Sequence, residues 1–166
     1  MLNRTIIPEL TRAMVQDTND SRLRVALVEY LNTLPGVNIV YHTADTRRAD
    51  AADLLGEFGP CAKAASPALL QALQGRDAMV RPSAAGALGK IQADPEVVIP
   101  LLIKCLDQKD VDDAAALALA DYGPAAKAAV PKLIELSKVR DKDLHHAVLV
   151  ALSKFDPAAA TQAGVR

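Results

Sequence analysis

The chain of 166 residues is long enough for one compact domain or for a run of repeated units of about 30 residues. Aromatic residues make up 3% of the sequence and apolar residues 51%, so a core must be built mainly from Ala, Leu, Val and Ile, which suits closely packed helices better than strands. The net charge is -1, with both signs mixed along the chain, which argues against a nucleic-acid-binding surface.

The apolar runs are far too short to cross a membrane, and residues 1–11 lack the apolar region of a signal peptide. We therefore expect a cytoplasmic chain without a membrane partner. The two cysteines, Cys61 and Cys105, form neither a metal motif nor a disulfide framework. We expect both to be buried as small apolar residues.

An internal repeat runs through the sequence. Its clearest mark is a leucine inside a short apolar segment, separated from the next by 24, 33, 31 and 33 residues: Leu31, Leu55, Leu88, Leu119 and Leu152. A second mark is a proline 19 to 23 residues earlier, followed two positions later by leucine: Pro8, Pro67, Pro100 and Pro131. Because proline kinks or starts a helix, each unit should hold a first helix near the proline and a second helix ending near the leucine.

The first unit covers about residues 1–36, with a polar turn at 17–20 between its two helices. The second unit, about 37–58, is nine residues short of the usual spacing and lacks room for a full first helix. We expect a loop or a single turn at 37–46 and a helix at about 45–58. The loop carries Tyr41 and His42, which are candidate binding residues, although a purely connecting segment is the simpler explanation of the loop.

Three full units follow at about residues 59–92, 93–122 and 123–156. Each opens with a Gly-Pro or Asp-Pro pair, which indicates the end of one helix and the start of the next. Each also has a polar turn, at 75–77, 107–110 and 140–143, whose Asp side chains should cap the second helix. Residues 157–166 begin like another first helix, and either fold back as a cap or leave an apolar face for a second copy, as in a homodimer, or for a missing domain.

The Gly-Pro segments at 59–70 and 123–134, followed by the Ala-rich segment at 84–89, resemble the short HEAT repeats first grouped with phycobilin lyase subunits. The resemblance covers nearly the whole chain. It implies an all-α fold, a right-handed α-solenoid of stacked antiparallel helix pairs in a single domain spanning residues 1–166. It also implies a scaffold that mediates protein interaction, because many members of the family are adaptors and few are enzymes.

The residues give little support to catalysis. None of the three histidines, His42, His145 and His146, precedes a Glu, as the di-iron site of HEAT-like hydroxylases would need. The sequence has no Trp and no basic column, as HEAT-type DNA glycosylases would need. We predict a chain that is not an enzyme and that has no cofactor and no metal site. The alternative is a phycobilin-lyase-like subunit handling a tetrapyrrole chromophore.

The outward side of the second helices is the expected binding surface, because in HEAT arrays these helices usually line the concave face. Its polar positions form a strip that is more acidic than basic: Glu29, Asp50, Asp53, Glu57, Lys90, Asp113, Asp121 and His146. We therefore predict a protein partner that docks a basic segment there, while a solvated face without a ligand is the simpler interpretation. A column of arginines, Arg24, Arg48 and Arg81, falls among the leucines and should hold neighbouring units together through loop carboxylates such as Asp20, Asp45 and Asp77.

Overall fold

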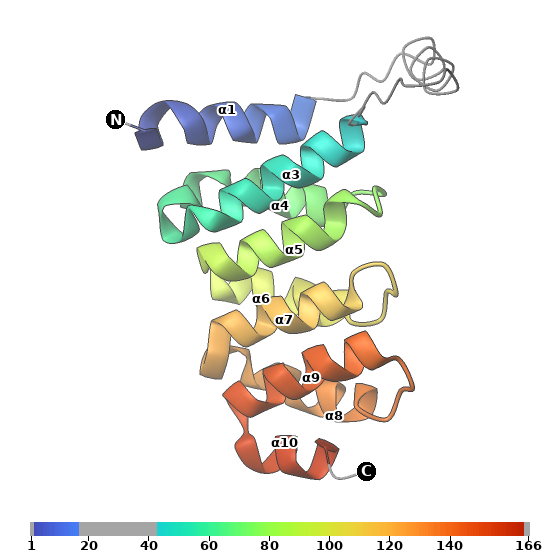
Figure 1. The fold of residues 1–166 in the computed structure, drawn as a ribbon. Coiled ribbons are helices and arrows are strands. Elements are labelled where there is room, and N and C mark those ends of the chain that lie inside the picture. Colours follow the sequence, from blue (N-terminus) through green and yellow to red (C-terminus); the bar gives the residue numbers. More distant parts are fainter. Residues whose placement is uncertain (1, 17–42, 165–166) are drawn as a thin grey trace, which may run out of the picture.

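The computed structural model describes residues 2–16 and 43–164, and all their regular structure is helical (Figure 1). Four helices correspond to the second helix of a unit, and we call them the B helices: α3 (Ala44–Glu57), α5 (Val80–Ile91), α7 (Asp112–Tyr122) and α9 (Lys142–Phe155). The remaining helices are α1 (Leu2–Gln16), α4 (Ser66–Leu73), α6 (Pro95–Cys105), α8 (Val130–Leu136) and α10 (Pro157–Gly164). Two 3-10 segments, η1 (Gly59–Ala65) and η2 (Gly123–Ala129), precede α4 and α8.

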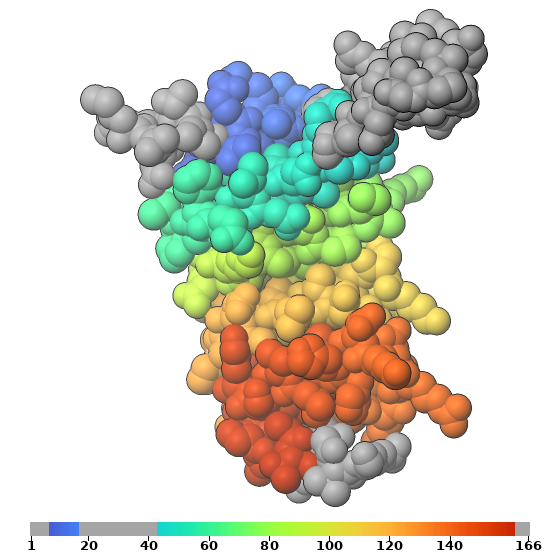
Figure 2. All heavy atoms as spheres, viewed as in Figure 1, coloured from blue at the N-terminus to red at the C-terminus, as the bar shows by residue number. Residues whose placement is uncertain are grey.

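The helices form two layers. The B helices are stacked in the nearer layer of Figure 1, with α4, α6 and α8 behind them. In the space-filling view the chain forms successive bands from α1 at one end to α10 at the other, so each pair of helices contacts mainly its neighbours in sequence (Figure 2). This arrangement is an all-α solenoid, as predicted, and its cores are shared between adjacent pairs.

The predicted leucine column forms the centre of the core. Leu55, Leu88, Leu119 and Leu152 are each 0% exposed. Alanines surround them on both sides of each B helix, and Ala52, Ala85 and Ala116 are also fully buried. Small side chains of this kind allow the helix backbones to come close together, since no long side chain separates them.

Two glycines mark where the B helices approach most closely. A Cβ atom added to Gly56 would lie 3.0 Å from Cα of Ala87, and one added to Gly89 would lie 2.7 Å from Cα of Ala118. A side chain at Gly89 would overlap the next B helix, so glycine is required there, and one at Gly56 would be unusually tight against Ala87. Gly86, on the outward side of α5, meets nothing within 4 Å.

The proline patterns act as helix boundaries. Gly59 and Gly123 end their helices with φ values of 53° and 56°, a left-handed region that favours glycine. Pro60 and Pro124 then stand in the first turn of η1 and η2. In the second proline column, Pro67 and Pro131 stand in the first turns of α4 and α8, whereas Pro8 and Pro100 lie inside α1 and α6.

The position of α1 differs from the expectation that the helix ending near residue 58 has no first helix to pair with. In the structure α1 packs against α3 and also contacts α4. The sequence of α1 explains why it pairs with α3 as α4 pairs with α5. Met14 follows Pro8 of α1 by six residues, just as Leu73 follows Pro67 of α4. Within the described residues, α1 is therefore the first helix that pairs with α3. The predicted boundary at residues 36 and 37 lies outside the described residues.

The C-terminal tail folds back onto the last pair. α10 packs against α9 and α8, and its Ala159 is buried. Asp156 caps the helix, since its Oδ1 accepts hydrogen bonds from the backbone N–H groups of Ala158 and Ala159. The tail thus follows the first of the two predicted alternatives, a cap, while a homodimer through this end stays a prediction.

Substitution of Gly89 by Ala should destabilise the stack, because its new methyl group would overlap the backbone of α7. We expect a loss of about 1–3 kcal/mol in the free energy of unfolding, the usual cost of overpacking. Urea denaturation followed by circular dichroism measures this loss. The matched control is Gly86→Ala, which has open space and should be neutral or stabilising by up to about 1 kcal/mol, the helix propensity difference. Equal effects of the two substitutions would show that close approach at Gly89 is not a constraint.

Candidate interaction surface

The outward sides of the four B helices form one continuous surface, which we call the B-helix face. Its members project away from the leucine core and are exposed or partly exposed. They are Asp50, Asp53 and Glu57 from α3, Ser83, Gly86 and Lys90 from α5, Asp113, Leu117 and Asp121 from α7, and His146, Val150 and Lys154 from α9.

Charges alternate across the C-terminal ends of the B helices. Lys90 Nζ lies 2.5 Å from Glu57 Oε1, and Lys154 Nζ lies 3.4 Å from Asp121 Oδ1. The hydrogen bond from Lys90 lowers the pKa of the Glu57 carboxyl and raises the pKa of the Lys90 ammonium. Because these pairs are largely exposed, they add little to stability. The two lysines do neutralise the charges of Glu57 and Asp121, which makes these carboxylates less available to a basic partner.

The acidic character that remains is concentrated on α3. Asp53 accepts one hydrogen bond, from Ser83 Oγ at 3.0 Å, and its charge also acts on Lys90. Asp50 lies one turn earlier on the same face, is exposed, and forms no ion pair with the described residues. Asp50 and Asp53 together therefore offer carboxylate oxygens to a partner.

The other end of the face is different. Oδ1 of Asp113 accepts a hydrogen bond from the backbone N–H of Ala114 at 2.7 Å, so this carboxylate is partly used within the first turn of α7. Leu117 is 43% exposed and aligns with Asp53 and Gly86 on the neighbouring B helices. Leu117 is not among the residues predicted from the sequence, although its position one turn before Asp121 places it on the predicted strip. His146 is exposed on α9.

Some predicted residues lie outside the described residues. These are Glu29 of the acidic strip, Arg24 of the arginine column, and the loop residues Tyr41 and His42. Of the two cysteines, Cys105 is buried as expected, but Cys61 is exposed, which corrects the prediction. Cys61 lies directly after Pro60 in η1, where Ala62 and Ala65 supply the buried side.

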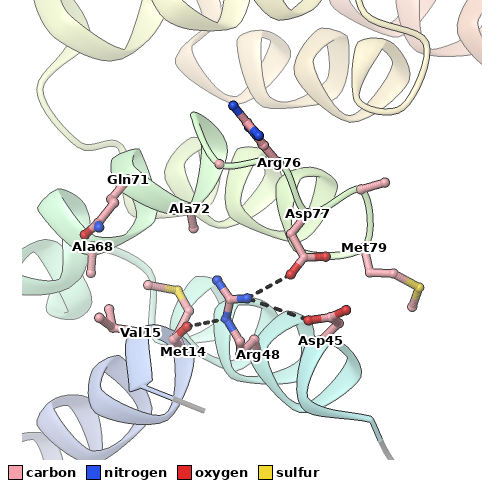
Figure 3. Close-up of a pocket in the computed structure, with 12 residues that line it drawn as sticks. Met14, Val15, Asp45, Arg48, Ala68, Gln71, Ala72, Arg76, Asp77 and Met79 are labelled. Atoms are coloured by element: carbon pink, nitrogen blue, oxygen red, sulfur yellow. Dashed lines mark hydrogen bonds and ion pairs between the residues drawn. The ribbon is translucent and has the colours of Figure 1, made fainter. Parts of the chain in front are cut away.

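Arg48 on α3 and Arg81 on α5 make equivalent contacts with the neighbouring helices and turns. Arg48 Nε donates to the carbonyl of Met14 at 2.8 Å, and its Nη1 lies 2.8 Å from Asp77 and 3.7 Å from Asp45 (Figure 3). Arg81 Nε donates to the carbonyl of Leu73 at 3.1 Å, and its guanidinium also binds Asp110 and Gln108. Each guanidinium thus joins the end of a first helix to the turn of the following unit.

The arginines also explain why the predicted aspartate caps are partly wrong. Asp141 does cap α9, since its Oδ1 accepts from the N–H groups of Asp143 and Leu144. The side chains of Asp77 and Asp110 instead bind Arg48 and Arg81, and α5 and α7 have no side-chain cap. In α9 the position of the arginine is taken by His145, whose Nδ1 lies 3.0 Å from the carbonyl of Ser137.

A cavity lies beside the Arg48 ion pairs, between α1, α3 and the turn after α4 (Figure 3). Its volume is about 730 Å³, and Met14, Val15, Ala68 and Ala72 provide the apolar part of its wall. Of its charged groups, Arg48 is bound to Asp45 and Asp77, whereas Arg76 is directed away from them (Figure 3). Among the described residues, no cluster of His, Cys, Asp or Glu side chains is suited to hold a metal ion. None of the described helices is long and apolar enough to cross a membrane.

Comparison with known proteins supports the same class of fold. A family model of HEAT repeats matches residues 37–120, which is half of the chain. The chain therefore belongs to the HEAT-repeat family. A search of curated proteins and a search of solved structures found no match.

Replacing Arg81 by Leu should weaken the stack, because the carbonyl of Leu73 loses a donor and Asp110 loses its cation. We expect a loss of about 2–3 kcal/mol in the free energy of unfolding, measured by urea denaturation. Arg81→Lys should recover only part of this loss, since an ammonium cannot reach three acceptors in the planar geometry of a guanidinium. As a control, Arg12→Ala removes an exposed pair with Glu9 and should change stability by less than about 0.5 kcal/mol. Full recovery with Lys would contradict the bridging geometry.

Proposed function

We propose that the chain is a non-catalytic scaffold that binds a protein partner through the B-helix face. The observation that carries the proposal is the division of charge on this face. Glu57 and Asp121 are paired with lysines, whereas Asp50 and Asp53 keep carboxylate oxygens directed outward from a helix whose inner side is buried in the core. Two carboxylates one turn apart favour a basic segment of a partner. The cytoplasmic location expected from the sequence is part of this proposal.

The shape of the face supports a partner that crosses several B helices. Gly86 lies between Asp53 and Leu117 along the row, and the space above it is open. Leu117 exposes an apolar side chain beyond it. A segment lying across α5 would therefore place a basic residue near α3 and an apolar residue near α7. Apolar contact supplies affinity at such a surface, and charge supplies selectivity.

Selection of 16-residue peptides from a random phage-displayed library tests this proposal without assuming a partner. We expect enriched peptides to carry net positive charge together with an apolar residue. Their affinity should fall at least tenfold for Asp50→Lys/Asp53→Lys and should weaken as salt is raised. Gly86→Gln should also reduce binding, because its side chain fills the open space while favouring the helix.

The matched control is Glu96→Lys/Glu135→Lys, which makes the same change in charge on α6 and α8, in the other layer. It should leave peptide affinity within about twofold. Enrichment of acidic or uncharged peptides, or equal loss of binding with both pairs of substitutions, would contradict docking on the B-helix face.

A further inference from the structure

A second groove lies on the side of the molecule where the turns within the pairs are found. It runs between the turn after α4, at residues 74–76, and the C-terminal part of α6, and has a volume of about 500 Å³. Its walls include Arg76, Arg81, Leu101, Lys104 and Gln108, with Cys105 among them. None of its lining residues belongs to the B-helix face.

The charges of this groove are of one sign. Arg76, Arg81 and Lys104 line it, and no acidic residue does. The nearest carboxylates along the chain are already bound: Asp77 by Arg48, Asp107 by Lys132 and Asp110 by Arg81. Burial raises the pKa of the Cys105 thiol, so Cys105 adds no negative charge near neutral pH. After Arg81 is balanced by Asp110, two positive charges remain.

Those two charges belong to side chains available to a ligand. Arg76 and Lys104 are exposed, and the side chain of neither forms a hydrogen bond or an ion pair with the described residues. Figure 3 shows that Arg76 is directed away from Arg48 and Asp77, which leaves its guanidinium outside that network. Two cations on opposite walls of a groove are suited to bind a carboxylate between them.

The size and apolar part of the groove favour a peptide over a small inorganic anion. Leu101, which is partly exposed, contributes apolar surface beside the cations. A groove of this volume can hold several side chains of a peptide, since ligand pockets usually measure about 300–1,000 Å³. An isolated phosphate would leave the exposed part of Leu101 without a contact.

We propose that this groove is a second docking site, for an acidic segment of a protein partner in which Glu or Asp side chains stand next to an apolar residue. Arg76 and Lys104 bind the carboxylates, and Leu101 contacts the apolar residue. The site is separate from the B-helix face and selects the opposite charge, so the scaffold holds two segments of different chemistry. The inference does not depend on whether the B-helix face binds a basic segment.

Titration of the full chain with a fluorescein-labelled 12-residue peptide of alternating Glu and Leu, followed by anisotropy, tests the proposal. We expect saturable binding that weakens at least tenfold in Arg76→Gln/Lys104→Gln. The control is Lys63→Gln/Lys127→Gln, which removes two exposed lysines from η1 and η2 and should leave the affinity within about twofold. Arg81 is left unchanged, because it holds the units together. Circular dichroism of both pairs confirms that the helices are intact.

Amide chemical shifts of the 15N-labelled chain locate the site. The acidic peptide should shift signals of residues 74–76 and of α6, and should leave those of α3 unchanged. The absence of saturable binding, equal loss in both pairs of variants, or shifts confined to the B-helix face would overturn the proposal. Inorganic phosphate that competes with the peptide at equal concentration would overturn the assignment of a peptide as the ligand.

Discussion

The structure depends on how closely its B helices approach one another. Where Gly56 meets Ala87 and Gly89 meets Ala118, the helix backbones leave no room for a larger side chain. Fully buried alanines on the same helices extend this contact along their length. Close approach brings many atoms into contact with few aromatic residues, Tyr122 and Phe155 among them, which explains how a chain with 3% aromatics forms a continuous core.

Two arginines fix the relative orientation of the packed helix pairs. Arg48 and Arg81 each bind a carbonyl at the end of a first helix and a carboxylate in the next turn, so they hold adjacent pairs in one orientation. Because Asp77 and Asp110 bind these two arginines, they do not neutralise Arg76 and Lys104. The groove lined by Arg76 and Lys104 is therefore positive. The same stack leaves Asp50 and Asp53 outward on the other surface. Structural pairing on one side thus determines which charges remain for binding.

Periodicity was sufficient to predict the layers, because residues such as Leu88 and Leu119 recur at a spacing that only a stacked hairpin explains. The Gly-Pro pairs likewise predicted helix boundaries, since the left-handed conformation at Gly59 and Gly123 is a local property. Contacts across about 30 residues were harder to predict. The pairing of Glu57 with Lys90, the place of α1 beside α3, and the need for glycine at Gly89 all depend on how one unit is set against the next, which the pattern within a unit does not contain.

The central claim is that neighbouring pairs stabilise one another, so that pairs with a neighbour on both sides are the most stable. Hydrogen exchange of the intact chain, followed by mass spectrometry of its peptides, tests this claim most directly. The account predicts slowest exchange in α5 and α7, with exchange becoming faster towards α1 at one end and α10 at the other. Uniform protection along the chain, or slowest exchange in α1 or α10, would contradict it.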